Sequence, residues 1–192
     1  MAAIAVAGVG MMMVCSSSLA AVMLMGGEEE TPTPTTTTTA GPSGPVLPSA
    51  QYVRVKRPSA DYPGNIINLG ELEVFDKAGT NIALNTTVTG GPGNHPAGPW
   101  PNLTDGNYNN FAHTFNNGES FIEVDLGAVK EIAKIVISNR KSCCQDRLGG
   151  AKIELLDGSR ANVTTTPAIE SDKMKLTYDF DVATPAWEYA DA

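Results

Sequence analysis

Hydrophobic and polar residues alternate, or form short apolar runs, along the chain beyond residue 51, and both patterns are typical of β-strands. No window of helical length has the apolar spacing of one helix face, and the nearest, residues 128–134, is short and contains β-branched residues. The pattern therefore predicts an all-β domain, an antiparallel β-sandwich of the jelly-roll type. The predicted strands cover residues 52–55, 69–75, 121–126, 132–137, 151–156 and 175–180.

A long stretch without a strand pattern, residues 90–118, is rich in Gly, Pro and Asn. Connections of this length in a compact domain usually carry function or bind something that orders them. This stretch is therefore a candidate functional segment.

The N-terminal segment has a different pattern, because residues 2–25 contain no charged side chain and a Gly-Gly pair and three glutamates follow. About 20 helical residues, each rising about 1.5 Å, span a hydrocarbon core of roughly 30 Å. Residues 1–27 are therefore predicted to form a single transmembrane helix that anchors the chain. A signal peptide is the alternative, since Ser18-Leu19-Ala20 fits a cleavage site, although no basic segment precedes it and apolar sequence continues beyond it.

Residues 28–50 are rich in Thr, Pro and Gly and contain too little apolar surface to offset their chain entropy on folding. They predict an extended linker, either O-glycosylated or unmodified. Residues 51–192 would then form one sandwich domain outside the cytosol, attached to a membrane by the linker and anchor. Asn-x-Thr sequons at Asn85, Asn102 and Asn162 fit an exported domain.

The charge balance and the motif content exclude two broad classes of function. The net charge is −8, with 13 basic and 21 acidic residues, whereas nucleic-acid binding needs clustered Lys and Arg. The chain contains neither a Gly-x-Ser-x-Gly nor a His-Glu-x-x-His motif, its carboxylates are scattered, and His95 lies in a Gly/Pro loop. We therefore expect a binding protein, not an enzyme, and no nucleic-acid partner.

Three cysteines are present, and Cys15 lies in the predicted membrane segment. The adjacent pair Cys143 and Cys144 can bond to each other, stay free or cross-link chains. Neither zinc spacing nor a Cys-x-x-Cys redox motif is present, so metal and redox roles are not expected for this pair.

Four motifs lie between residues 102 and 156: LTDGN at 103–107, HT at 113–114, FIEVDLG at 121–127 and SNRKSCCQDRLGGA at 138–151. In order and spacing they closely resemble the fucolectin branch of the F5/8 type C, or discoidin, family. The resemblance implies a galactose-binding-like jelly roll with lectin activity toward fucose or related sugars on surface glycans. Residues 52–55 and 69–75 resemble the strand pair that closes the domain in many relatives, so the strand order here would be permuted.

The resemblance also implies a sugar site. In fucolectins a His and two Arg at similar separations hold the sugar hydroxyls, and a vicinal disulfide packs against the sugar ring. Arginine suits this role because its planar guanidinium presents several N–H donors at fixed angles. Relatives usually carry Asp where this chain has Ser142, so the orientation of the arginines and the identity of the sugar are left open. The corresponding residues here are His113, Arg140, Arg147, Cys143 and Cys144.

A calcium ion in the loop before the sugar site is the third implication of the resemblance. Ca²⁺ takes about six to eight oxygen ligands in a flexible geometry, which suits irregular backbone. The alternative is that Asp-Gly-Asn at 105–107 is only a turn. The candidate ligands are Asn102, Asp105, Asn107, Asn110 and Glu71.

We therefore expect a membrane-anchored lectin that recognises surface glycans for attachment or adhesion. The alternative is a structural protein of a virion or cell envelope, in which the sandwich contacts other virion proteins or further copies of itself. Membrane-tethered discoidin-like domains occur in large DNA viruses, which supports this alternative by analogy alone.

Overall fold

The computed structural model describes residues 44–57, 65–116, 118–170 and 172–191, which all belong to one compact unit, residues 40–192. The predicted anchor or signal peptide at residues 1–27, and most of the predicted linker, lie outside the described residues. In the part of the chain that is described, no helix is long and apolar enough to cross a membrane.

The described residues form ten β-strands and two short 3-10 helices, η1 and η2. In chain order these elements are β1 (Ser49–Lys56), β2 (Asn68–Phe75), β3 (Thr87–Gly91), η1 (Trp100–Leu103), β4 (Ala112–His113), β5 (Phe121–Glu131), β6 (Lys134–Asn139), η2 (Gln145–Leu148), β7 (Lys152–Leu156), β8 (Asn162–Thr165), β9 (Lys175–Asp179) and β10 (Trp187–Ala190).

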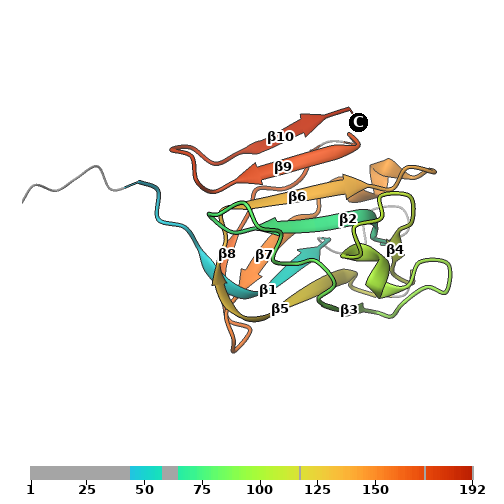
Figure 1. Ribbon diagram of the computed structural model, residues 1–192. Coiled ribbons are helices and arrows are strands. Elements are labelled where there is room, and N and C mark those ends of the chain that lie inside the picture. The colour runs from blue at the N-terminus through green and yellow to red at the C-terminus, as the bar shows by residue number, and fades with distance from the viewer. Residues whose placement is uncertain (1–43, 58–64, 117, 171, 192) are drawn as a thin grey trace, which may run out of the picture. The chain divides into compact units, whose positions relative to one another are not determined.

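The strands form two five-stranded sheets, and each pair of neighbouring strands is antiparallel. The first sheet has the order β3-β5-β1-β7-β8 and the second has the order β10-β9-β6-β2-β4 (Figure 1). The prediction of an all-β, antiparallel fold is confirmed, and the two sheets are consistent with the predicted β-sandwich.

Inward-facing side chains from both sheets form one hydrophobic core. In β1, Val53 and Val55 are fully buried and Arg54 lies between them on the opposite face, and β5 alternates in the same way with Ile122 and Val124 buried. Successive side chains of a strand point to opposite faces, so this alternation gives each strand one apolar face. Each fully buried Val or Ile contributes about 1.5–3 kcal/mol through the apolar area removed from water.

The six predicted strands correspond to β1, β2, β5, β6, β7 and β9. β5 continues to Glu131, so most of the stretch that came nearest to a helical pattern is strand. β1 begins at Ser49 and Ala50 is fully buried, so the sandwich starts two residues before the predicted boundary at residue 51. Four strands are not predicted from the sequence: β3, β4, β8 and β10.

The connections that carry the candidate site meet at one end of the sheets. β4 pairs with the beginning of β2, and β6 runs antiparallel to β2, so β6 ends near β4. Figure 1 shows η1, β4 and the segment after β6 at this same end. The sheet topology thus brings together parts of the two segments in which the fucolectin-like motifs lie.

Candidate functional site

His113 and Arg147 lie next to each other at this end of the second sheet. His113 ends β4 and pairs with Asn68 in β2, while Arg147 belongs to η2. Nη1 of Arg147 donates a hydrogen bond of 3.2 Å to Oδ1 of Asn68 and lies 3.5 Å from Nε2 of His113. Because Asn68 is buried within β2, it fixes the guanidinium relative to the imidazole.

Hydrogen bonding and burial set the protonation state of His113. Its Nδ1 lies 2.6 Å from the carbonyl oxygen of Thr114, which can only accept, so Nδ1 carries the proton and Nε2 is an acceptor in the neutral ring. Burial lowers the pKa of His113, and the nearby His95, Arg147 and Arg140 lower it further, against the opposing effect of the Thr114 hydrogen bond. The imidazole is therefore neutral near pH 7 and presents Nε2 as an acceptor.

Arg140 stacks on Phe111, whose ring lies near His113. Its guanidinium carbon is 3.7 Å from the centre of the Phe111 ring, and the Phe111 and His113 ring centres are 6.2 Å apart. Nε of Arg140 donates a hydrogen bond of 2.8 Å to Oγ of Ser142, the residue that stands where relatives have Asp. Burial, and then the charge of Arg147, lower the pKa of Arg140. The Ser142 hydroxyl thus orients Arg140, whose geometry the sequence leaves open.

Cys143 and Cys144 are bonded to each other as a vicinal disulfide, which is one of the three states left open by the sequence. Cys143 is exposed and Cys144 is half-buried. Cys144 has a left-handed φ of 66° and directly precedes η2. The bridge therefore restricts the backbone between Arg140 and Arg147, the two arginines whose relative position the site depends on.

His95, for which no role is predicted from the sequence, contacts His113. The two ring centres are 4.6 Å apart, and the His95 ring packs edge-on against Phe115 at 5.5 Å. The backbone nitrogen of His95 donates a hydrogen bond of 2.8 Å to the carbonyl oxygen of His113, which holds the contact in place. In the sequence, the position of His95 inside the Gly/Pro-rich stretch 90–118 could have indicated a role in the site.

Three of the five candidate calcium ligands lie together: Glu71 in β2, and Asp105 and Asn110 in the loop between η1 and β4. Glu71 is fully buried in β2, and its Oε1 accepts a hydrogen bond of 3.0 Å from the backbone nitrogen of Gly106. Nδ2 of Asn110 donates a hydrogen bond of 2.7 Å to Oδ2 of Asp105. Oε2 of Glu71 and Oδ1 of Asn110 are both buried and have no hydrogen-bond partner among the described residues. Two buried, unsatisfied acceptors are costly without a partner, and a cation would satisfy both.

The other two candidates are engaged elsewhere. Nδ2 of Asn102 donates to the carbonyl oxygen of Phe111 at 3.1 Å, and Oδ1 of Asn107 accepts from the backbone nitrogen of Asn109 at 3.1 Å. No group of three His, Cys, Asp or Glu side chains in the described ranges could hold a metal ion. A cation here would therefore depend on amide and backbone oxygens in addition to the carboxylates of Glu71 and Asp105.

The environment of Glu71 raises its pKa to about 7, mainly through burial and then through the negative charges of Asp105 and Glu73, against the opposing hydrogen bond from Gly106. The carboxyl is therefore partly protonated near pH 7. A bound cation would favour the ionised form, since opposite charge stabilises a carboxylate.

Comparison with known proteins identifies a family resemblance over part of the chain. No curated protein and no solved structure matches it. Residues 102–188, which include His113, Arg140 and Arg147, match the F5/8 type C family model described as "NedA-like, galactose-binding domain". Domains of this family are generally non-catalytic, and the similarity supports a carbohydrate-binding role.

Proposed function

We propose that the domain is a lectin module that binds a monosaccharide of a surface glycan at the end of the second sheet. The observation that carries this proposal is the convergence of two guanidinium groups on one neutral imidazole, since Arg147 lies 3.5 Å from Nε2 of His113 and Arg140 stacks on the neighbouring Phe111. The family match over residues 102–188 supports the same role.

The chemistry of these groups suits a neutral sugar. Both arginines donate hydrogen bonds, so they bind hydroxyl oxygens, while Nε2 of His113 accepts a hydrogen bond from a hydroxyl. The disulfide of the exposed Cys143 and the exposed Phe115 ring offer apolar surface for a ring face or a methyl group. A deoxy sugar such as fucose carries a methyl group beside its hydroxyls, so we propose fucose or a related sugar as the ligand.

We also propose that Ca²⁺ binds beneath the loop that precedes this site. The support is the pair of buried, unpartnered oxygens, Oε2 of Glu71 and Oδ1 of Asn110, beside the Asp105 carboxylate. Asn102 and Asn107 would contribute backbone or reoriented amide oxygens. When bound, the ion would balance the negative charge of the Glu71 carboxylate. It would also hold the loop that carries Phe111, the ring on which Arg140 stacks.

Residues 1–27 are proposed to anchor this module in a membrane, with the linker holding it away from the surface. The support is the uncharged run at residues 2–25, which is long enough to span a bilayer as a helix. Expression in a secretory host followed by alkaline extraction of the membranes tests this proposal. Release of the full-length chain into the supernatant would refute the anchor.

A glycan array probed with the full-length chain in mild detergent, with Ca²⁺ and with EDTA, tests the sugar site. We expect binding to a restricted set of fucose- or galactose-containing glycans, and at least about tenfold weaker binding by an Arg140→Ala plus Arg147→Ala variant, because each charge-assisted hydrogen bond contributes about 1.5–3 kcal/mol before solvent competition. A Lys77→Ala plus Lys152→Ala variant, which loses the same charge from exposed positions, should bind normally. The absence of binding to any glycan at high protein concentration would refute the proposal.

A further inference from the structure

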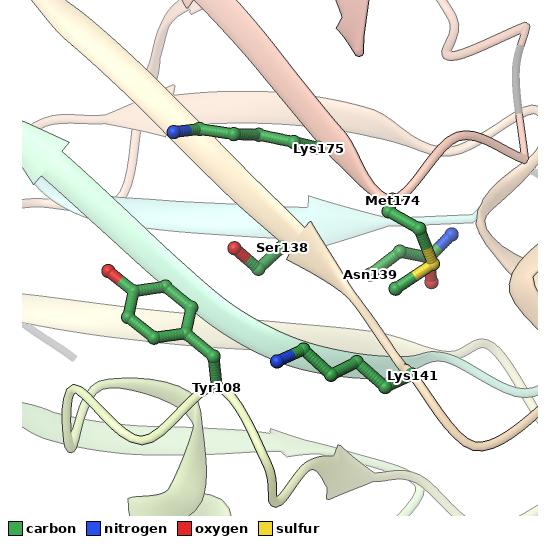
Figure 2. A pocket seen from close by; sticks show the side chains of 6 residues that line it. All are labelled: Tyr108, Ser138, Asn139, Lys141, Met174 and Lys175. Atoms are coloured by element: carbon green, nitrogen blue, oxygen red, sulfur yellow. The ribbon is translucent and has the colours of Figure 1, made fainter. Parts of the chain in front are cut away.

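A recess lies beside the proposed sugar site, on the outer face of the second sheet. Its volume is about 200 Å³. Ser138 in β6 and Lys175 in β9 are cross-strand partners on this face, whereas their neighbours Ile137 and Leu176 are buried in the core. The lining residues are Tyr108, Ser138, Asn139, Lys141, Met174 and Lys175 (Figure 2).

The walls of this recess are held by hydrogen bonds. The backbone nitrogen of the buried Asn139 donates to the carbonyl oxygen of Met174 at 2.8 Å, and its side-chain nitrogen donates to the carbonyl oxygen of Gln145 at 3.0 Å. Nζ of Lys141 donates to Oδ1 of Asn109 at 3.2 Å, which ties this lysine to the loop that carries Tyr108. The recess is therefore a formed feature of the fold.

The charges around the recess favour an anion. Figure 2 shows the amines of Lys141 and Lys175 and the hydroxyls of Tyr108 and Ser138 around the same opening. The described lining residues include two lysines and no carboxylate. Glu73 accepts a hydrogen bond from the Tyr108 hydroxyl, and the buried Glu71, which pairs with Ser138 across the strands, also lies near Tyr108. The two ammonium groups therefore belong to the lining itself, whereas the carboxylates of Glu73 and Glu71 do not.

The recess and the proposed sugar site share two short segments of chain. Arg140 stacks on Phe111, while the adjacent Lys141 bonds to Asn109 in the same loop. One segment thus supplies Arg140 to the sugar site and Lys141 to the recess. Arg140 and Lys141 are adjacent in the chain, so the ligand that would contact both is a glycan of at least two sugar units.

We propose that this recess binds the carboxylate or sulfate of a second, anionic sugar residue in the same glycan. This inference rests on the proposed sugar site and extends its specificity to glycans that carry a negative charge. Lysine suits this role because its ammonium group is a compact point charge with three donors, and the hydroxyl of Ser138 supplies a further donor.

Calorimetric titration of the full-length chain with Lewis X, its sulfated form and sialyl Lewis X tests the proposal, because all three carry both fucose and galactose. We expect the charged glycans to bind about fivefold or more tightly than neutral Lewis X, and the preference to shrink with added salt. Comparison of the sulfated and sialylated arms identifies the preferred anion.

Substitutions separate this inference from the proposal on which it rests. Lys141→Gln plus Lys175→Gln should abolish the preference for charged glycans and leave the affinity for neutral Lewis X within about twofold. Lys152→Gln, an exposed lysine of β7 in the other sheet, should leave the preference intact. Equal affinities for charged and neutral glycans, or a preference that survives the double substitution, would overturn the anion site while leaving the sugar site standing. Failure of all three glycans to bind would overturn both.

Discussion

His113 can accept a hydrogen bond from a sugar hydroxyl only while its ring is neutral. Burial lowers the pKa of His113 below its ordinary value of 6.5, and Arg140, Arg147 and His95 surround the ring. Binding should therefore be constant above about pH 7 and weaken only as the pH falls through the lowered pKa of His113, where the protonated ring loses its acceptor and faces the two arginines. Titrations at saturating Ca²⁺ measure this dependence, since they keep Glu71 ionised. Binding that persists unchanged at a pH where an NMR titration shows the His113 ring to be protonated would exclude His113 as an acceptor.

Arg140 contributes a planar group as well as a charge. Arg140→Lys keeps the charge but removes the stacking on Phe111 and the bond from Nε to Ser142. We expect about tenfold weaker glycan binding, because lysine lacks the fixed fork of donors. Arg160→Lys is the matched control, since Arg160 stacks on Tyr52 at 4.1 Å but lies in the connection between β7 and β8 of the first sheet. Equal effects of the two substitutions on binding would mean that the stacking at Arg140 has no part in recognition.

The sequence predicts a site residue where that residue lies in a short, contiguous motif. His113 and the two arginines lie in recognisable motifs, and the structure brings them together, although their binding role stays a prediction. His95 and Lys175 carry no such signal, because their positions depend on how separate segments return to the same end of the sheets. The bond from Arg140 to Ser142 likewise depends on side-chain geometry that a motif does not specify.

At the scale of elements, the strands that sequence periodicity predicts are those with one face in the core. β8 (Asn162–Thr165) has no fully buried residue, β3 contains two glycines and β4 has only two residues. Such strands exist because a neighbouring strand offers hydrogen bonds, and they have too few core-facing side chains to form a pattern. Pairing of this kind cannot be read from a local pattern.

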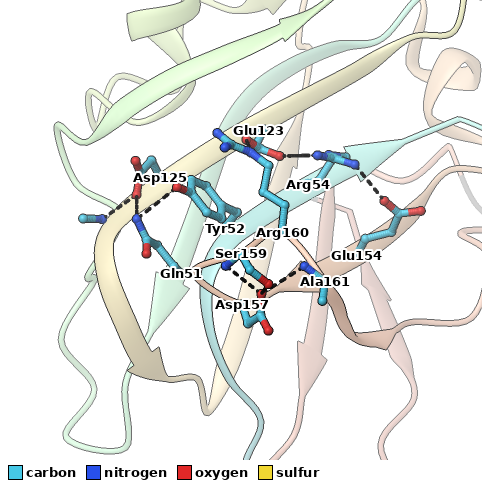
Figure 3. A network of polar contacts seen from close by, with 11 residues as sticks. Gln51, Tyr52, Arg54, Glu123, Asp125, Glu154, Asp157, Ser159, Arg160 and Ala161 are labelled. Atoms are coloured by element: carbon cyan, nitrogen blue, oxygen red, sulfur yellow. Dashed lines mark hydrogen bonds and ion pairs between the residues drawn. The ribbon is translucent and has the colours of Figure 1, made fainter. Parts of the chain in front are cut away.

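Ion pairs between side chains on the outer face of the first sheet connect β1, β5 and β7 (Figure 3). Glu123 of β5 is nearly buried and accepts hydrogen bonds from Arg54 of β1 at 2.6 Å and from Arg160 at 3.2 Å. Arg54 also lies 3.5 Å from Glu154 of β7. Glu123 is therefore the centre of the network and Glu154 is at its edge.

Replacing the central carboxylate should cost far more stability than replacing the peripheral one. We expect Glu123→Gln to lower the free energy of unfolding by about 2–3 kcal/mol, because it leaves two arginines without their buried partner. Glu154→Gln should cost less than about 1 kcal/mol, as expected for a half-exposed pair. Urea denaturation of both variants measures the difference. Similar losses would mean that the network stabilises through packing alone.

At the scale of the whole molecule, Glu71 couples the stability of the sandwich to pH and to cations. The raised pKa of about 7 means that folding favours the protonated form, while an unfolded Glu71 ionises near 4.5. Without a cation, stability should fall by about 3 kcal/mol as the pH rises from about 4.5 to about 7, because the unfolded chain then binds fewer protons.

Calcium should reverse this loss. We expect Ca²⁺ to raise the melting temperature of the chain, most strongly above about pH 7, and to release protons on binding near that pH. Calorimetry in two buffers of different ionisation enthalpy measures the proton release. Glu71→Gln should remove the response, and Glu188→Gln, an exposed residue of β10 in the same sheet, should keep it. A melting temperature that Ca²⁺ does not change would refute the site.

β1, the strand that directly follows the predicted linker, lies in the middle of its sheet and pairs with both β5 and β7. β10, at the other end of the chain, is an edge strand that pairs only with β9 among the described strands. Tension applied through the N-terminal end would load two ladders of hydrogen bonds in shear at once, whereas tension at the C-terminal end would peel one strand away stepwise. A module held from its N-terminal side would therefore withstand pulling by a bound surface far better than one held from its C-terminal side.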